Sequence, residues 1–237
     1  MKKPIIAINN SFYTHNLFPL YNHFFKGIGC EVLIPQRPNS EGLNYEQSQF
    51  CYPMQLSLML FYDIIGKADF YFLPSIFETD AEKPTEIQRL DFNCACAFIT
   101  GEPFILKQAF KDFDIGDKII SPSLNFNNGY IKELPNFIKI ANRIGISDNN
   151  LIKQSYQNAI TKQQQFQNEL YEIGNKILVD LEKKTDEYAI VLLGRSYNST
   201  SELSNKSIPR KFASRNITIL PLDMIDVRSA NKVERMY

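Results

Sequence analysis

The chain alternates between short apolar runs and longer stretches with apolar residues at helical spacing. The apolar run at 4–8 predicts a buried strand, and the spacing over 17–28 predicts a helix. Gly29 ends this helix, and residues 31–34 predict the next strand. A strand–helix–strand unit of this kind indicates a parallel sheet.

The alternation continues along the chain. A helix is predicted from Pro53 to about Gly66, because proline is well tolerated at the first helical position. Residues 70–73 predict a strand, and the acidic stretch Glu78 to Gln88 predicts a solvated loop. Further elements are a Pro-started helix near Pro103, a strand at 118–120 and a helix at 134–144.

A long amphipathic pattern begins after Ser147, which we interpret as an N-cap. It continues for more than thirty residues, which corresponds to a helix of roughly 50 Å at about 1.5 Å per residue. A second strand–helix–strand unit follows, with elements at 188–193, 209–214 and 217–220. One such unit leaves open sheet edges, so we expect this lobe to be unfinished in the present chain.

These patterns predict an α/β fold with a Rossmann-like or flavodoxin-like parallel-sheet lobe, a long connecting helix and a partial second α/β lobe. The predicted boundaries are 1–146 for the first lobe, which carries the cysteine segments, 147–184 for the connecting helix and 185–237 for the partial lobe.

The composition limits the classes of partner that the protein is expected to bind. The chain has 237 residues, of which 44% are hydrophobic, and its 26 basic and 26 acidic residues give no net charge. A neutral chain argues against a nucleic-acid partner, which needs a basic excess. Its apolar runs are shorter than the roughly 18 residues of a membrane span, and the N-terminal run is too short for a signal peptide. We therefore expect a cytoplasmic protein with no membrane partner.

Four cysteines carry the candidate chemistry: Cys30, Cys51, Cys94 and Cys96. In a cytoplasmic chain they are not expected to form disulfides, and their spacing does not indicate a complete four-ligand metal site. Cys51 and the Cys94/Cys96 pair each precede a helix-like stretch, where free backbone N–H groups and the helix dipole favour the thiolate. Thiolates bind metals and act as nucleophiles, although free cysteines are more often buried and inert.

Several segments share motifs with a known family. Cys51-Tyr52-Pro53 precedes a predicted helix and the strand that ends at Pro74, and Cys96 to Phe104 reads as a second cysteine motif. The segments Leu192 to Asn198 and Ile208 to Lys211 form a third. In order, they resemble the uncharacterised domain that follows the ATPase modules of CoA-substrate-specific enzyme activases. That domain is similar to the iron–sulfur subunits of 2-hydroxyacyl-CoA dehydratases and to double-cubane cluster proteins.

The resemblance implies that Cys51 and Cys96 are ligands of an iron–sulfur cluster. Cys94 has no clear counterpart in the family. It is a third candidate ligand, because iron–sulfur clusters normally need three or four thiolates. Two or three thiolates imply an open or shared site. The resemblance also implies an ATPase activase module or subunit as partner, supplying low-potential electrons, and a CoA thioester or another small molecule as substrate.

The chain also departs from the family pattern. Ala97 and Ser196 stand where prolines are usual, and Thr100 stands where the family has a glutamine. The ATPase modules and a further cysteine segment lie outside this sequence. We therefore expect a piece of a larger system that is inactive as an isolated chain, and we assign no catalytic residue.

Three alternatives stay open at this point. The turn Gly194, Arg195, Ser196 and Tyr197 follows a predicted parallel strand, so it is a candidate cofactor-binding loop for an anion or CoA phosphate. Such a turn can also have a structural role alone.

The chain as a whole can instead be a cluster-free scaffold or interaction domain with buried cysteines, or a flavodoxin-like small-ligand-binding module that uses this loop. A homodimer is also left open.

Overall fold

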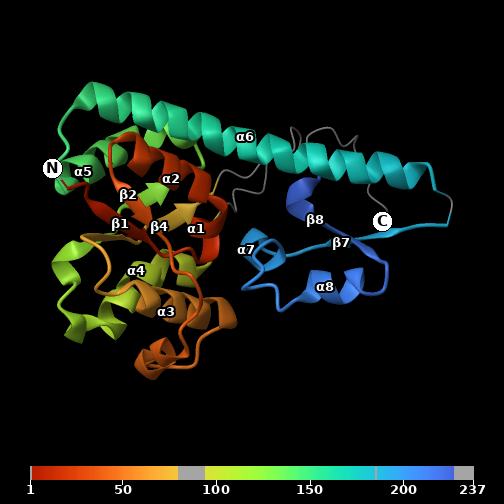
Figure 1. Ribbon diagram of the computed structural model, residues 1–237, viewed down its shortest axis with the longest axis horizontal. Coiled ribbons are helices and arrows are strands. Elements are labelled where there is room, and N and C mark those ends of the chain that lie inside the picture. Colours follow the sequence, from red (N-terminus) through yellow and green to blue (C-terminus); the bar gives the residue numbers. More distant parts are fainter. Residues whose placement is uncertain (1, 80–93, 185, 227–237) are drawn as a thin grey trace.

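A four-stranded parallel sheet forms the centre of the protein, whose computed structural model describes residues 2–79, 94–184 and 186–226 (Figure 1). The strands are β1 (Ile5–Ile8), β2 (Glu31–Leu33), β3 (Phe70–Phe72) and β5 (Ile119–Ile120). Their order, β2-β1-β3-β5, follows the start of the flavodoxin-like strand order. The predicted α/β class with a parallel sheet is confirmed. Most of the predicted loop Glu78 to Gln88 lies outside the described residues.

Two further strands, which the apolar pattern does not predict, form a separate two-stranded sheet that follows β3 and β5. They are β4 (Ser75–Glu78) and β6 (Ser123–Asn125), which pair in parallel. Pro74 and Pro122 stand directly before them, and the amide of Ser75 donates to the Pro122 carbonyl at 2.9 Å. Because proline has no N–H to give, it interrupts the ladder and separates β3 from β4 and β5 from β6.

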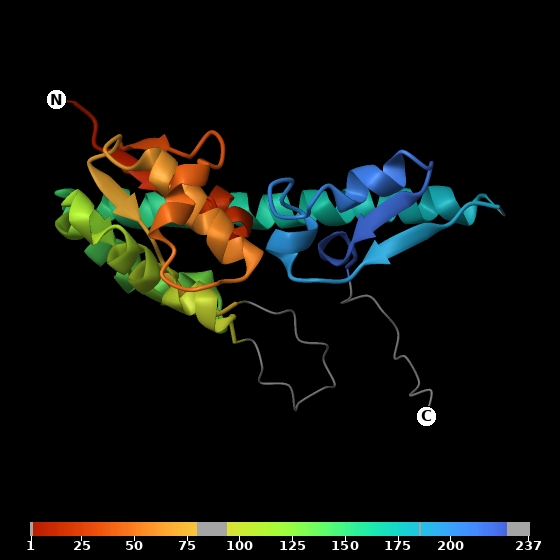
Figure 2. The same cartoon turned by 90° about the horizontal axis from the view of Figure 1, so that it is seen from below.

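Helices cover both faces of the sheet (Figures 1 and 2). One face carries α2 (Phe18–Gly27), α5 (Leu134–Ile144) and α6 (Asn149–Glu182), and the other carries α3 (Tyr52–Ile64) and α4 (Ala97–Ala109). Between α2, α5 and α6 the core is aromatic: the rings of Phe137 and Tyr156 stack with centroids 4.2 Å apart, and Phe24 meets Phe137 edge-on at 4.7 Å. Such pairs add to the stability gained by burial alone.

The helix predicted over 17–28 is confirmed as α2, and the short α1 (Phe12–Asn16) that precedes it was not predicted. Two helix starts differ from the sequence predictions. Helix α4 begins at Ala97 and not near Pro103, which lies inside it. The predicted N-cap Ser147 is wrong: the Asp148 carboxylate caps α6, because its oxygen accepts from the amides of two residues in the first turn.

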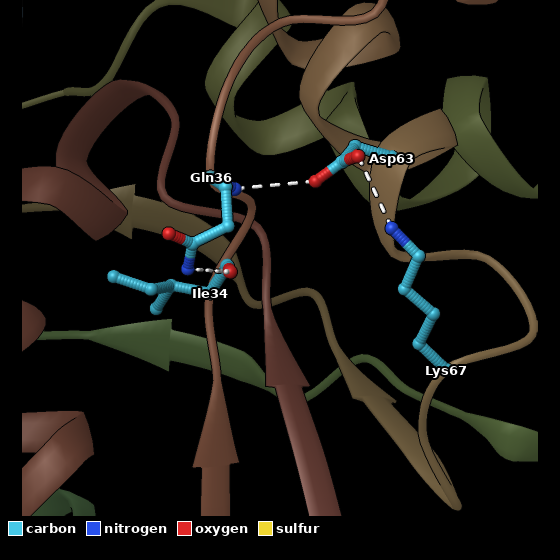
Figure 3. Close-up of polar contacts among 4 residues, drawn as sticks. All are labelled: Ile34, Gln36, Asp63 and Lys67. Atoms are coloured by element: carbon cyan, nitrogen blue, oxygen red, sulfur yellow. Dashed lines mark hydrogen bonds and ion pairs between the residues drawn. The ribbon is translucent and has the colours of Figure 1, made fainter.

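The connection after β2 is tied to α3 (Figure 3). The Gln36 amide donates to one carboxylate oxygen of Asp63 at 3.2 Å, and the Lys67 ammonium binds the other at 3.1 Å. A 3₁₀ turn in the same connection packs so closely on α3 that a Cβ at Gly42 would lie 2.6 Å from the Leu58 carbonyl oxygen. These contacts hold the connection against the middle and the C-terminal end of α3.

The C-terminal part contains a two-stranded parallel sheet beside α6 (Figures 1 and 2). Its elements are β7 (Ala189–Leu192), α7 (Ser196–Ser199), α8 (Ile208–Ala213) and β8 (Thr218–Pro221). Short 3₁₀ turns complete the chain: η1 (Ser40–Tyr45), η2 (Lys111–Phe113), η3 (Gly116–Lys118), η4 (Tyr130–Glu133) and η5 (Leu222–Met224). The domain boundaries at 146 and 184 stay a prediction. Within the described ranges, no helix combines the length and apolar character needed to cross a membrane.

Helix α6 contacts the C-terminal part through η5. The Gln167 side-chain amide donates to the Asp223 carbonyl at 3.2 Å. Two turns further along the helix lies Gly174, where an added Cβ would fall 1.9 Å from the Met224 carbonyl oxygen. Only glycine permits this approach, so the sequence of α6 is fitted to the segment that follows β8.

Candidate functional site

Both predicted cysteine motifs begin a helix. Cys51 is the N-cap of α3, and its carbonyl accepts from the amides of Met54 and Gln55. Cys96 is the N-cap of α4, and its carbonyl accepts from the amide of Thr100. Neither thiol makes a capping hydrogen bond. Because α3 and α4 both follow the carboxyl ends of parallel strands, the two thiols lie on the side of the sheet where α/β proteins bind ligands.

The two cysteine segments meet each other. The ring of Phe50, which precedes Cys51, packs edge-on against the ring of Phe98, with centroids 5.5 Å apart. Tyr197 from α7 lies close enough to both thiols for them to influence its pKa. Burial raises the pKa of Tyr197 to about 12; the Arg195 charge opposes this shift, and Cys96 and Cys51 add to it. The structure therefore gathers Cys51, Cys96 and Tyr197 in one place.

The cysteines differ in exposure. Cys51 and Cys94 are exposed, and Cys96 is half-buried. Cys30 lies in the core, where burial raises the pKa of its thiol to about 11. The expected burial of the cysteines is therefore confirmed for Cys30 alone, since Cys51 and Cys94 are exposed and Cys96 is half-buried.

Cys94 does not complete a metal site with the other two thiols. Its backbone forms an isolated bridge with Glu78, just before the chain turns into α4. Among the residues that the structure describes, no three His, Cys, Asp or Glu side chains converge as metal ligands. Thiolate sulfur suits iron–sulfur clusters, and the Cys51–Cys96 pair fits as part of a ligand set.

The C-terminal part covers the start of α3. The hydroxyl of Tyr52, next to Cys51, donates to the Leu203 carbonyl at 3.2 Å. The ammonium of Lys206 lies 2.9 Å from the centre of the Tyr52 ring, in a cation–π contact. These contacts bring one positive charge close to the Cys51 segment.

The predicted cofactor-binding turn, Gly194 to Tyr197, lies between this thiol pair and the rest of the C-terminal part. Ser196 donates through its hydroxyl to the Asp223 carboxylate at 2.6 Å. Tyr197 packs edge-on against the rings of Phe12 and Tyr13. The turn thus uses two of its side chains for contacts within the chain, and its role in binding an anion stays a prediction.

A buried carboxyl group, which the sequence reasoning missed, lies between α3 and α4. Glu102 is 2% exposed, and one of its carboxyl oxygens accepts from three side chains. The donors are the Ser57 hydroxyl at 2.5 Å, the Asn9 amide at 3.1 Å and the Ser11 hydroxyl. Ser57 follows Cys51 by six positions, and Glu102 follows Cys96 by six. The network therefore ties the loop after β1 to both cysteine-bearing helices.

The protonation of Glu102 is set by two opposing effects. Burial raises the pKa of its carboxyl group to about 7, and the hydrogen bonds from Ser11, Ser57 and Asn9 oppose this rise. The group therefore takes up or releases a proton near neutral pH. Its sequence signal was a single acidic residue in the otherwise apolar first half of α4.

Comparison with known proteins identifies the family of this chain. Residues 5–225 match the family described as the CoA enzyme activase uncharacterised domain. The chain belongs to this family. The resemblance inferred from the cysteine motifs is thereby confirmed over almost the whole chain. No curated protein and no solved structure matches it.

Proposed function

We propose that this activase-family domain is one component of an ATP-dependent iron–sulfur reductase or activase system related to the 2-hydroxyacyl-CoA dehydratases, acting in the cytoplasm. In this proposal Cys51 and Cys96 supply two thiolates to a cluster that takes part in low-potential electron transfer. An ATPase activase module or subunit is the partner. A CoA thioester or another small molecule is the eventual substrate.

One observation carries the proposal. Cys51 and Cys96 cap two neighbouring helices, and their segments touch through Phe50 and Phe98. Two thiolates are fewer than the three or four that a cluster normally needs. The remaining ligands would come from residues outside the described ranges or from the partner subunit, so the cluster would lie at a shared edge.

The surroundings of the pair also suit a redox site. Both thiols lie at helix N-termini, where backbone N–H groups and the helix dipole favour negative charge. Arg195 is close to Tyr197, and Lys206 lies over the ring next to Cys51. These positive charges balance part of the negative charge that thiolates and a reduced cluster carry.

Iron and acid-labile sulfide per chain, measured after anaerobic reconstitution, test the proposal. We expect bound iron in the wild type and a loss of most of it in Cys51→Ser and in Cys96→Ser. Cys30→Ala is the matched control, because this thiol is buried away from the pair. Cys94→Ser reports whether the third candidate contributes.

Two other results would contradict the proposal. Equal iron in the wild type and in both serine variants would remove the thiol pair from the site. A wild type that binds no iron, with all four thiols reduced, would leave the scaffold or the ligand-binding alternative.

A further inference from the structure

A cavity of about 530 Å³ lies between α6 and the carboxyl ends of the strands in the β4–β6 and β7–β8 sheets. Thr79 after β4 and Phe126 after β6 line it from one side, and Ser196 after β7 and Asp223 after β8 line it from the other. The crevice outside the carboxyl ends of parallel strands is the usual ligand position in open α/β sheets. The volume falls in the range of small-molecule sites.

The charge of the lining decides which ligands fit. Among the described residues that line the cavity, Asp223 is the only charged one. Its two carboxylate oxygens accept from the hydroxyls of Ser196 at 2.6 Å and Ser199 at 3.3 Å. No lysine or arginine of the described ranges forms an ion pair with it. A phosphate or carboxylate ligand would therefore meet a like charge here without a basic partner.

Aromatic rings make up a large part of the wall. Five described residues contribute them: Tyr13, Phe126, Tyr130, Phe166 and Tyr171. The faces of aromatic rings attract cations, and organic ammonium ions are commonly recognised this way. The apolar ring surfaces also accommodate the hydrocarbon part of such a ligand.

A buried acceptor in the same wall lacks a donor. The side-chain oxygen of Asn16, which lines the cavity, is buried and has no hydrogen-bond partner among the described residues. A buried acceptor left unpaired is destabilising. An ammonium group brings several N–H donors, which suit the Asp223 carboxylate. The Asn16 oxygen would have to turn towards the cavity before it could accept one of them.

We propose that this cavity binds a small organic ammonium ion, whose charge pairs with Asp223 and whose apolar part contacts the aromatic rings. The site is separate from the thiol pair and does not depend on a cluster. It also places the phosphates of any CoA ester elsewhere, because the described lining has no basic residue to receive them.

Isothermal titration calorimetry on the full, iron-free chain tests the proposal with probes matched in shape. The first set is 2-phenylethylammonium, 2-phenylethanol and phenylacetate, which are cationic, neutral and anionic. The second is choline and its neutral analogue 3,3-dimethyl-1-butanol. Ionic strength is held constant throughout. We expect at least one ammonium probe to bind tenfold or more tightly than its neutral analogue, and phenylacetate not to bind.

Variants locate the binding. Asp223→Asn should weaken the ammonium probe tenfold or more, and Asp180→Asn, an exposed acid on α6, should leave it unchanged. Phe166→Leu changes the wall without touching the Asp223 hydrogen bonds, and it should also weaken binding. This variant keeps the test decisive if Asp223→Asn does not fold.

Three results would overturn the proposal: no binding by any ammonium probe at millimolar concentration, equal binding of a neutral analogue, or binding unaffected by both cavity variants. None of them depends on iron content. A failure here is therefore distinct from a failure of the cluster proposal.

Discussion

The ring of Tyr197 in α7 meets the ring of Phe12 in α1 edge-on, with centroids 5.3 Å apart and an interplanar angle of 78°. Phe12 has a positive φ of 43°, a conformation that bulky residues rarely adopt and that costs on the order of 1–3 kcal/mol. Both rings are buried in the main hydrophobic core. This contact therefore joins α7 of the C-terminal part to α1, close to the thiol pair.

Removing the Tyr197 ring should loosen that junction. We expect Tyr197→Ala to lower the free energy of unfolding by about 3 kcal/mol, since large buried rings typically cost this much when truncated. Tyr197→Phe should lose much less, because it keeps both edge-on contacts. Urea denaturation measures the difference. Tyr188→Ala, at a ring 65% exposed, is the control, and an equal loss there would contradict the role of the junction.

Gly174 should be irreplaceable in α6. Gly174→Ala would place a Cβ 1.9 Å from the Met224 carbonyl oxygen, so η5 must move away and the protein should lose stability. Gly101→Ala in α4 is the matched control, because its Cβ would meet only Ile105 at 3.8 Å. There the higher helix propensity of alanine should stabilise by about 0.5–1 kcal/mol. Thermal melts that show the same sign for both variants would refute the close contact.

Glu102 should make stability depend on pH. Its pKa is about 7 in the folded protein and near 4.5 when unfolded, so between these values the folded state binds more protons. Stability should then fall as pH rises from 4.5 to 7, by up to about 1.4 kcal/mol per pH unit, and level off above pH 7.

Glu102→Gln keeps an oxygen acceptor for the same three donors but cannot titrate. The difference in unfolding free energy between wild type and this variant, measured by urea denaturation from pH 5 to 8, should therefore fall as pH rises to 7 and then level off. Glu169→Gln, an exposed acid on α6, should follow the wild type at every pH. A constant difference between Glu102→Gln and wild type would show that the carboxyl group stays in one protonation state.

Thiol alkylation should separate the cysteines by their environment. Cys51 and Cys94 are exposed and should react first with iodoacetamide, and the half-buried Cys96 should follow. Cys30 should stay unmodified near neutral pH, because its thiol is buried and burial raises its pKa to about 11. Mass spectrometry of tryptic peptides measures each rate. Early labelling of Cys30 in the folded protein would contradict its place in the core.

Much of the fold could be read from local patterns. The parallel strands, the long helix after residue 148 and the cysteines at helix starts all depend on residues close together in the sequence. Local signals failed where two caps competed, as at Ser147 and Asp148. They also failed at Pro103, because a proline inside α4 looks like a helix start when its neighbours alone are considered.

The sequence by itself determined that Cys51 begins a helix and that Cys96 precedes one, that the sheet is parallel and which family the motifs resemble. Tertiary structure alone decided what these elements share. The contact of Asn9 with Glu102 spans 93 positions, and the cavity draws its lining from α6 and from segments that follow the strands of two sheets, β4–β6 and β7–β8. Periodicity reports only the face that a segment buries. Which polar groups meet across that face depends on the crossovers between strands, and these are set by packing of the whole chain.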